Sequence, residues 1–141
     1  MELQATQLAI DGLVINPVRL NFEMLDKLAP SVDIEGIVPG YKGQALRGSD
    51  VIAKGRPKNI ADFVVVHSTD GTFAASVPIA ELREKGYFVY KFEGKPLPRE
   101  MGGPVRLLIP DSTSPCHNVK YVGRLEIRRG KGIDSVPKGD H

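Results

Sequence analysis

Thiols and indoles are nearly absent from this chain, which has one Cys, no Trp and 6% aromatic residues among its 141 positions. The single thiol, Cys116, cannot form an internal disulfide, and it cannot supply the cysteine cluster of a zinc or iron–sulfur centre. We therefore expect Cys116 to be a free thiol with no catalytic role, in a protein of a reducing compartment. The few aromatic residues also argue against a stacking platform for single-stranded nucleic acid.

Long apolar runs and a strong charge of one sign are also missing. No stretch approaches the roughly 20 apolar residues that a membrane span requires. The first residues, Met1-Glu2-Leu3-Gln4, have neither the basic start nor the apolar run of a signal peptide, so we expect a soluble, cytoplasmic protein. The formal net charge of +2 is too small to indicate a nucleic-acid surface. The sequence therefore predicts neither a nucleic-acid partner nor a membrane span, and it leaves any protein partner open.

What the chain does contain is a series of short apolar runs separated by turn residues, with a few short helical patterns. Predicted strands are Leu3–Ile10, Val32–Ile37, Phe63–His67, Thr72–Val77, Phe88–Phe92, Val105–Ile109 and Val119–Ile127. Predicted helices follow the N-cap residue Asn21 and cover 49–54 and 78–85, and the glycine-rich stretch Gly36–Gly48 is expected to be a loop. This pattern predicts one α+β domain, mostly β with mixed sheets, over residues 1–128, and a polar tail over 129–141.

Arg106 is unusual because it lies inside the apolar run of a predicted strand. A guanidinium that is always charged requires an anion or a carboxylate partner if it is buried. One interpretation pairs Arg106 with a carboxylate of the same chain, such as Glu100 or Asp111. The other interpretation leaves Arg106 available to an anionic ligand.

Four segments, taken in chain order, resemble the sulfite oxidase family. GKPLPREMGGPVRLLIP at Gly94–Pro110 is similar to the family signature G-x-P-L-P-x-x-H-G-x-P-V/L-R-L/V-V-V-P, and NVKYVGRLEI at Asn118–Ile127 is similar to its S-V-K-W strand. HSTDG at 67–71 with VPIAEL at 77–82 resembles S-x-D-G-Y followed by L-P-L-x-x-L, and IDGLVINP at 10–17 resembles I-x-G-L-V-x-N-P. The resemblance implies a molybdopterin-binding fold of the sulfite oxidase type.

The resemblance also shows where this chain departs from the family, which holds molybdenum through a pterin dithiolene and one cysteine thiolate. The stretch that corresponds to the family's cysteine segment, Leu28–Gly48, contains no cysteine, and its nearest counterpart is Ile34–Ile37. Met101 stands where the family has histidine, His117 where it has arginine or lysine, and Tyr121 where it has tryptophan. We therefore expect no metal site and no catalytic molybdenum.

The residues that match the family point to a cofactor pocket. Arg106 and Lys120 stand at positions that help the family to hold the pterin and its phosphate, and His117 and Asn118 could add hydrogen bonds. The hypothesis is that Arg106 and Lys120 converge on one pocket for a phosphate, sulfate or pterin-type anion. No catalytic residue is identified.

Three functions remain open at this point. The first is a binding module that keeps an anion or molybdopterin pocket without catalytic molybdenum. The second is a molybdopterin-dependent oxidoreductase of a small oxyanion or oxide substrate, with the metal held only by the dithiolene and oxygen ligands. The third is a structural partner subunit.

Overall fold

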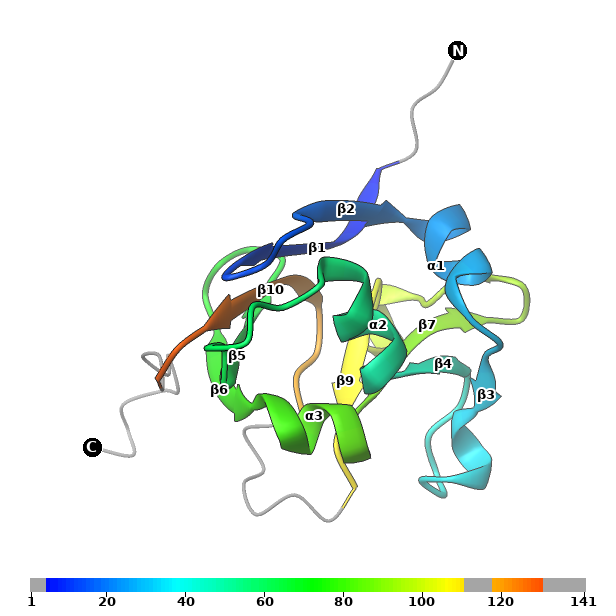
Figure 1. Ribbon diagram of the computed structural model, residues 1–141. Helices are drawn as coiled ribbons and strands as arrows, with labels where there is room; N and C mark the ends of the chain where they lie inside the picture. The colour runs from blue at the N-terminus through cyan, green and yellow to red at the C-terminus, as the bar shows by residue number, and fades with distance from the viewer. Residues whose placement is uncertain (1–4, 111–117, 131–141) are drawn as a thin grey trace.

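The computed structural model describes residues 5–110 and 118–130, which form two sheets and three short helices (Figure 1). The first sheet has the strand order β2-β1-β10-β5-β6. Its strands are β1 (Thr6–Gly12), β2 (Val18–Asn21), β5 (Phe63–Ser68), β6 (Ala74–Pro78) and β10 (Val122–Arg128). β1 and β10 pair in parallel, and the other neighbours are antiparallel. The sheet is therefore mixed, and its central pair joins strands from opposite ends of the described chain.

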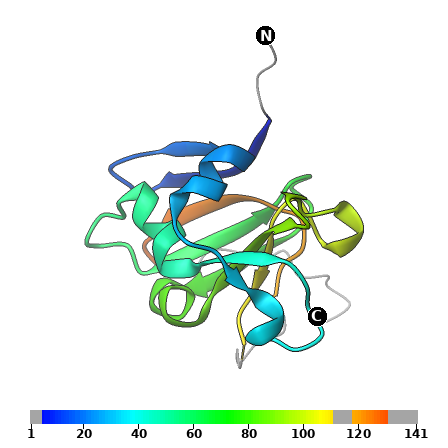
Figure 2. The same ribbon diagram turned by 90° about the vertical axis from the view of Figure 1, so that its right-hand side faces the viewer.

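The second sheet has the order β3-β4-β7-β8, with β9 also paired to β7. Its strands are β3 (Val32–Asp33), β4 (Gln44–Arg47), β7 (Tyr87–Phe92), β8 (Lys95–Pro96) and β9 (Arg106–Leu108). The helices are α1 (Phe22–Leu28), α2 (Gly48–Gly55) and α3 (Ile79–Lys85), with single 3₁₀ turns η1 (Ile34–Gly36) and η2 (Arg99–Met101). Figure 2 shows the β1–β2 ribbon at the top of the molecule, with α2 and then α3 below it. No described helix is long and apolar enough to cross a membrane.

The main core lies between the first sheet and the layer formed by α2, α3 and β7. Alternate residues of the central strands face this core, because side chains of a strand alternate between the two faces of its sheet. Its fully buried members include Leu8, Ile10, Val64, Val66, Leu125, Val51, Ile52, Leu82 and Phe88. A smaller core on the second sheet contains Ile34, Ala45, Val89, Leu97 and Leu108.

Local sequence signals place several of these elements. Asn21 caps α1, because its Oδ1 accepts a hydrogen bond from the backbone N–H of Met24 at 2.8 Å. The β-branched run Phe63–His67 forms β5 as predicted, and the helices expected after Asn21 and near 49–54 and 78–85 are all present.

The predicted loop Gly36–Gly48 is wrong at its end, because Gln44–Arg47 form β4. β4 pairs with β7. This long-range pairing stabilises a strand that the surrounding glycine-rich sequence does not predict. The predicted strand Val32–Ile37 is also too long: it stops at Asp33, whose side chain accepts from the Glu35 N–H and starts η1.

Candidate functional site

The side chains of Arg106 and Lys120, the two predicted cations of the site, both lie beside Gly102. It follows η2 with φ +97°, a conformation that favours glycine. A Cβ added to Gly102 would lie 3.0 Å from Cδ of Arg106 and 3.3 Å from Cγ of Lys120. The Tyr121 N–H donates to the carbonyl of Gly102 at 2.8 Å, which ties the segment before β10 to this turn. The stems of Arg106 and Lys120 therefore flank one glycine, although the residues come from different parts of the chain.

Arg106 lines a cavity of about 300 Å³ together with Gly40, Tyr41, Lys42 and Met101. Its guanidinium carbon lies 4.7 Å from the ring centroid of Tyr41, and Nη1 donates to the carbonyl of Met101 at 3.4 Å. Its Nε is buried and has no hydrogen-bond partner. Within residues 5–110 and 118–130, no carboxylate forms an ion pair with Arg106.

Glu100, one of the two predicted carboxylate partners, therefore does not pair with Arg106. The other, Asp111, lies outside the described residues. Stacking on the Tyr41 ring stabilises the cation without neutralising it. The cavity consequently has a positive wall formed by Arg106 and Lys42.

Lys120 lines a neighbouring cavity of about 390 Å³, whose walls also include Arg99, Asn118, Tyr121 and Asp70. The guanidinium carbon of Arg99 lies 4.6 Å from the ring centroid of Tyr121. Asn118 Oδ1 accepts a hydrogen bond from the N–H of Ile109 at 2.9 Å, so its oxygen is used to hold β9 and its amide nitrogen is oriented by that bond. The second cavity thus adds two cations to those of the first.

The hairpin between β5 and β6 forms one wall of the second cavity. Asp70 Oδ1 accepts from Ser68 Oγ at 2.8 Å, from Thr72 N at 3.0 Å and from Thr72 Oγ1 at 2.7 Å. These donors, above all the Thr72 N–H, lower the pKa of Asp70 from 3.8 to about 2. The carboxylate is therefore ionised near neutral pH and holds the turn through these three hydrogen bonds.

The predicted site residues are thus only partly together. Arg106 and Lys120 touch the same glycine, but their side chains line different cavities, and Asn118 lies on the Lys120 side. His117 lies outside the described residues, as does Cys116. Sequence reasoning missed four lining residues, which are Tyr41, Lys42, Arg99 and Tyr121 in a cationic or cation-stacking role.

Ile34–Ile37, which the resemblance makes the counterpart of the family's cysteine segment, has exposed Glu35 and Gly36 beside the buried Ile34. Ile34 is fully buried in the smaller core. Thiolate ligands are absent from the described residues, and no group of three or more His, Cys, Asp and Glu side chains gathers there in a way that could hold a metal ion.

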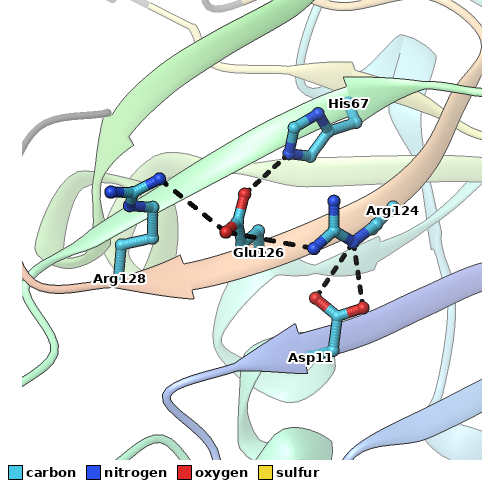
Figure 3. Close-up of polar contacts among 5 residues, drawn as sticks. All are labelled: Asp11, His67, Arg124, Glu126 and Arg128. Carbon is cyan, nitrogen blue, oxygen red and sulfur yellow. Dashed lines mark hydrogen bonds and ion pairs between the residues drawn. The ribbon is translucent and has the colours of Figure 1, made fainter. Parts of the chain in front are cut away.

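A separate charge network joins side chains of β1, β5 and β10 (Figure 3), and none of its five residues lines either cavity. Arg124 Nε donates to both carboxylate oxygens of Asp11, at 3.0 and 2.9 Å, and this bond raises the pKa of Arg124. His67 Nε2 lies 3.0 Å from Glu126 Oε1, so the histidine at the end of β5 is tied to β10. Glu126 also lies 3.9 Å from Arg124 and 3.8 Å from Arg128.

Comparison with known proteins agrees with this fold. Residues 38–132 match the family model described as the oxidoreductase molybdopterin binding domain. Mitochondrial sulfite oxidase of Homo sapiens is 33% identical over 76 residues, which cover 52% of this chain and 14% of that protein. The uncharacterized oxidoreductase YuiH of Bacillus subtilis is 29% identical over 112 residues, which cover 73% of this chain and 56% of that protein.

A solved structure extends the similarity to most of the described fold. The sulfane dehydrogenase SoxCD from Paracoccus pantotrophus has a TM-score of 0.71 and 22% identity, over 93% of this chain and 40% of that chain. The present chain thus spans only part of each of these relatives. The family match covers more than half of the chain, and the mixed sheets with three short helices have the sulfite oxidase architecture. The chain belongs to the family of oxidoreductase molybdopterin binding domains of the sulfite oxidase type.

Proposed function

We propose that this domain binds a pterin-type anion with two cavities, one lined by Arg106 and the other by Lys120, and that it does so without molybdenum held by a protein thiolate. The observation that carries the proposal is the environment of Arg106. Its guanidinium rests on an aromatic face, its Nε is buried without a partner, and no described carboxylate neutralises it. An uncompensated charge of this kind costs folding free energy, and an anionic ligand would offset that cost.

The residues on each side of Gly102 suit different parts of an extended anion. Arg106 presents a planar fork of donors and Lys42 a compact charge beside it, a combination that suits phosphate and other oxyanions. Lys120 and Arg99 add positive charge on the second side, and the Asn118 amide nitrogen adds a donor. The cavities, at about 300 and 390 Å³, are in the size range of small-molecule sites.

The group that the family implies fits these residues in its anionic part. Molybdopterin, when bound, supplies a pair of dithiolene sulfurs as metal ligands. The cations around Gly102 would hold its phosphate and pterin. A thiolate ligand from the protein is not available at the family's segment, where Ile34 is buried in the core.

A second candidate is a molybdopterin-dependent oxidoreductase that acts on a small oxyanion or oxide. Membership of the oxidoreductase family favours it. In that case the metal would be held by the dithiolene and oxygen ligands alone, and the cations of the first cavity would attract the anionic substrate.

The two candidates differ in metal content and in ligand binding. We would measure molybdenum and the fluorescence of oxidised pterin in freshly purified protein, and then titrate inorganic phosphate and a pterin phosphate by calorimetry. The proposal expects no stoichiometric molybdenum and saturable binding of the pterin phosphate. Arg106→Gln and Lys120→Gln should each weaken that binding by about ten- to a hundredfold, as expected for loss of a charged hydrogen bond.

The matched control is Arg19→Gln, a cation of β2 that lines neither cavity. It should bind like the parent. About one molybdenum per chain together with oxidation of sulfite would establish the second candidate instead. Equal binding by the parent and both cavity variants would contradict the pocket itself.

A further inference from the structure

Three segments meet at the end of the first sheet where β1 and β10 finish, and backbone hydrogen bonds join them. The Leu13 N–H, after β1, donates to the carbonyl of Ile127 in β10 at 2.8 Å. The Ile15 N–H donates to the carbonyl of Arg56, between α2 and β5, at 2.9 Å. Figure 1 shows the three segments on the left-hand side of the molecule. We call the surface that they form the basic end, and its residues are 13–16, 54–62 and 128–130.

Positive charge predominates at the basic end. Its cations are all exposed, and they are Lys54, Arg56, Lys58, Arg128 and Arg129. Its single carboxylate, on Asp62, accepts a hydrogen bond from the N–H of Gly130 at 2.6 Å, and Arg128 lies 3.8 Å from Glu126 of β10. The formal net charge of the whole chain is only +2, so the rest of the chain is net negative. An anionic surface would therefore orient the molecule with the basic end towards it.

Two large apolar side chains are exposed at the same end. Ile15 is 60% exposed and Ile60 is 55% exposed, and Ile60 lies in a turn in which the Ala61 N–H donates to the carbonyl of Lys58. Apolar side chains on such turns can enter the headgroup region of a bilayer, where their burial adds to the electrostatic attraction. Recognition of a peptide uses a groove or a strand edge instead, and neither isoleucine lies in a strand or lines the cavities of Arg106 and Lys120.

The backbone of Arg56 supports a role of this end in binding. Arg56 is the C-cap of α2 and has φ +52°, in the left-handed region that favours glycine. Its side chain is exposed, and among the described residues it forms no ion pair. The chain thus keeps a charge at a position where glycine would be less strained, which is typical of residues that meet a ligand.

From these features we infer that the basic end is a docking surface for a membrane with anionic headgroups. The cations lie against the headgroups, and Ile15 and Ile60 enter between them. Each Lys or Arg close to such a surface strengthens binding by roughly fivefold, and salt screens this part. The isoleucines add an apolar part that salt does not screen. The surface is independent of the proposed pterin pocket, since no residue of the basic end lines either cavity of that pocket.

Flotation of the full chain with lipid vesicles tests the inference. We would compare vesicles of phosphatidylcholine alone with vesicles that also contain about 30% phosphatidylserine, at about 0.05 and 0.5 M salt. The parent should float with the anionic vesicles, less strongly at the higher salt concentration, and should not float with the neutral ones. Equal binding to both kinds of vesicle, or binding to neither, would overturn the inference.

Three variants assign the binding to the basic end. Arg56→Gly removes a cation and suits the left-handed backbone, so it should fold like the parent and bind the anionic vesicles about fivefold more weakly. The double variant Ile15→Ser/Ile60→Ser should bind more weakly and lose its remaining binding at the higher salt concentration. Lys95→Gln, which removes an exposed cation of β8 in the second sheet, should bind like the parent. Undiminished binding by Arg56→Gly would contradict the inference, because misfolding cannot account for that result.

An acidic protein is the other partner whose charge would match these cations. Soluble poly-glutamate serves as its probe, and we expect it to bind the parent more weakly than the anionic vesicles do, because it offers no apolar layer to the isoleucines. Equal binding of poly-glutamate by the parent and by Ile15→Ser/Ile60→Ser, as tight as the binding of vesicles, would assign the basic end to an acidic protein and overturn the membrane inference.

Discussion

The outer face of the first sheet and the walls around Gly102 both carry arginines, but these arginines have different partners. On the outer face, Arg124 meets the two oxygens of Asp11 at 3.0 and 2.9 Å. At Gly102, Arg106 meets the ring of Tyr41 at 4.7 Å, and no carboxylate of the described residues pairs with it. A cation that is paired with a carboxylate of the same chain contributes to the stability of the fold. A cation that is stacked on an aromatic ring is not neutralised, so its charge stays available to an anionic ligand. The comparison separates an arginine that is paired within the fold from one that has no described carboxylate partner and that we propose binds an anion.

The largest expected loss of stability is that of Gly12→Ala, at the end of β1 in the first sheet. An alanine Cβ at Gly12 would lie 2.3 Å from the carbonyl oxygen of Ile127, and Gly12 has φ +88°. Because the obstacle is backbone of the neighbouring strand, Gly12→Ala should lower the free energy of unfolding by about 3 kcal/mol or more. Urea denaturation measures this loss.

Gly102→Ala is the matched variant in the other region. Its nearest atoms are side-chain carbons of Arg106 and Lys120, which can move. We expect a loss of about 1–2 kcal/mol from the positive φ, together with weaker binding of the pterin phosphate because both cations shift. Equal destabilisation by the two alanines would show that Gly102 is as structural as Gly12.

A smaller effect should distinguish the two arginines directly. Arg124→Met removes a half-exposed ion pair and should cost about 0.5–1 kcal/mol of unfolding free energy. Arg106→Met removes a charge without a carboxylate partner and should leave the stability unchanged or raise it. If both variants lose stability equally, Arg106 has a structural partner and the contrast between the regions disappears.

Replacing the ring beneath Arg106 should have an effect similar to the loss of one exposed ion pair. Tyr41→Leu removes the stacked face and should lower the unfolding free energy by about 0.5–1 kcal/mol, whereas Tyr41→Phe keeps the face and should match the parent. Thermal denaturation of the two variants side by side is the measurement. A loss in Tyr41→Phe would assign the stabilisation to the hydroxyl instead.

The smallest expected effect appears only in acid. Because the pKa of Asp70 falls from 3.8 in the unfolded chain to about 2, its stabilising effect is complete above about pH 4 and is lost as the pH falls towards 2. Asp70→Asn should remove this part of the acid dependence, and Thr72→Val should reduce it because a hydroxyl donor is lost. Acid titration followed by the hairpin's amide signals tests both. An unchanged profile in Asp70→Asn would assign the acid sensitivity to other carboxylates.

Local patterns in the sequence predicted much of the fold. The β-branched run of β5, the Asn21 cap and the proline before α3 each act over a few residues, so the sequence nearby is sufficient. β4 was missed because its stability comes from β7, some forty residues away, and not from its own composition. The division at residue 128 stays a prediction, because residues 131–141 lie outside the described part of the chain.

The candidate site was predictable only where single residues carry the signal. Arg106 is conspicuous in an apolar run, the family resemblance indicated Lys120, and Asn118 was expected only to add a hydrogen bond beside them. Tyr41 stacks on Arg106 and Lys42 lines the same cavity only once the glycine-rich segment has folded, and no short-range pattern predicts this arrangement.

The parallel pairing of β1 with β10 has a consequence for the order in which the protein is made. Asp11 and Arg124 are 113 positions apart, so a ribosome finishes β1 long before its central neighbour exists. Until β10 emerges from the exit tunnel, β1 and β5 each present an edge of unpaired backbone groups. Such an edge can pair with a wrong strand or with another chain. β10 then enters between them and closes both edges at once. The central strand of the first sheet is therefore the last of its strands to be synthesised. A nascent chain stalled before residue 122 would have two unpaired strand edges and no β10 to pair with them.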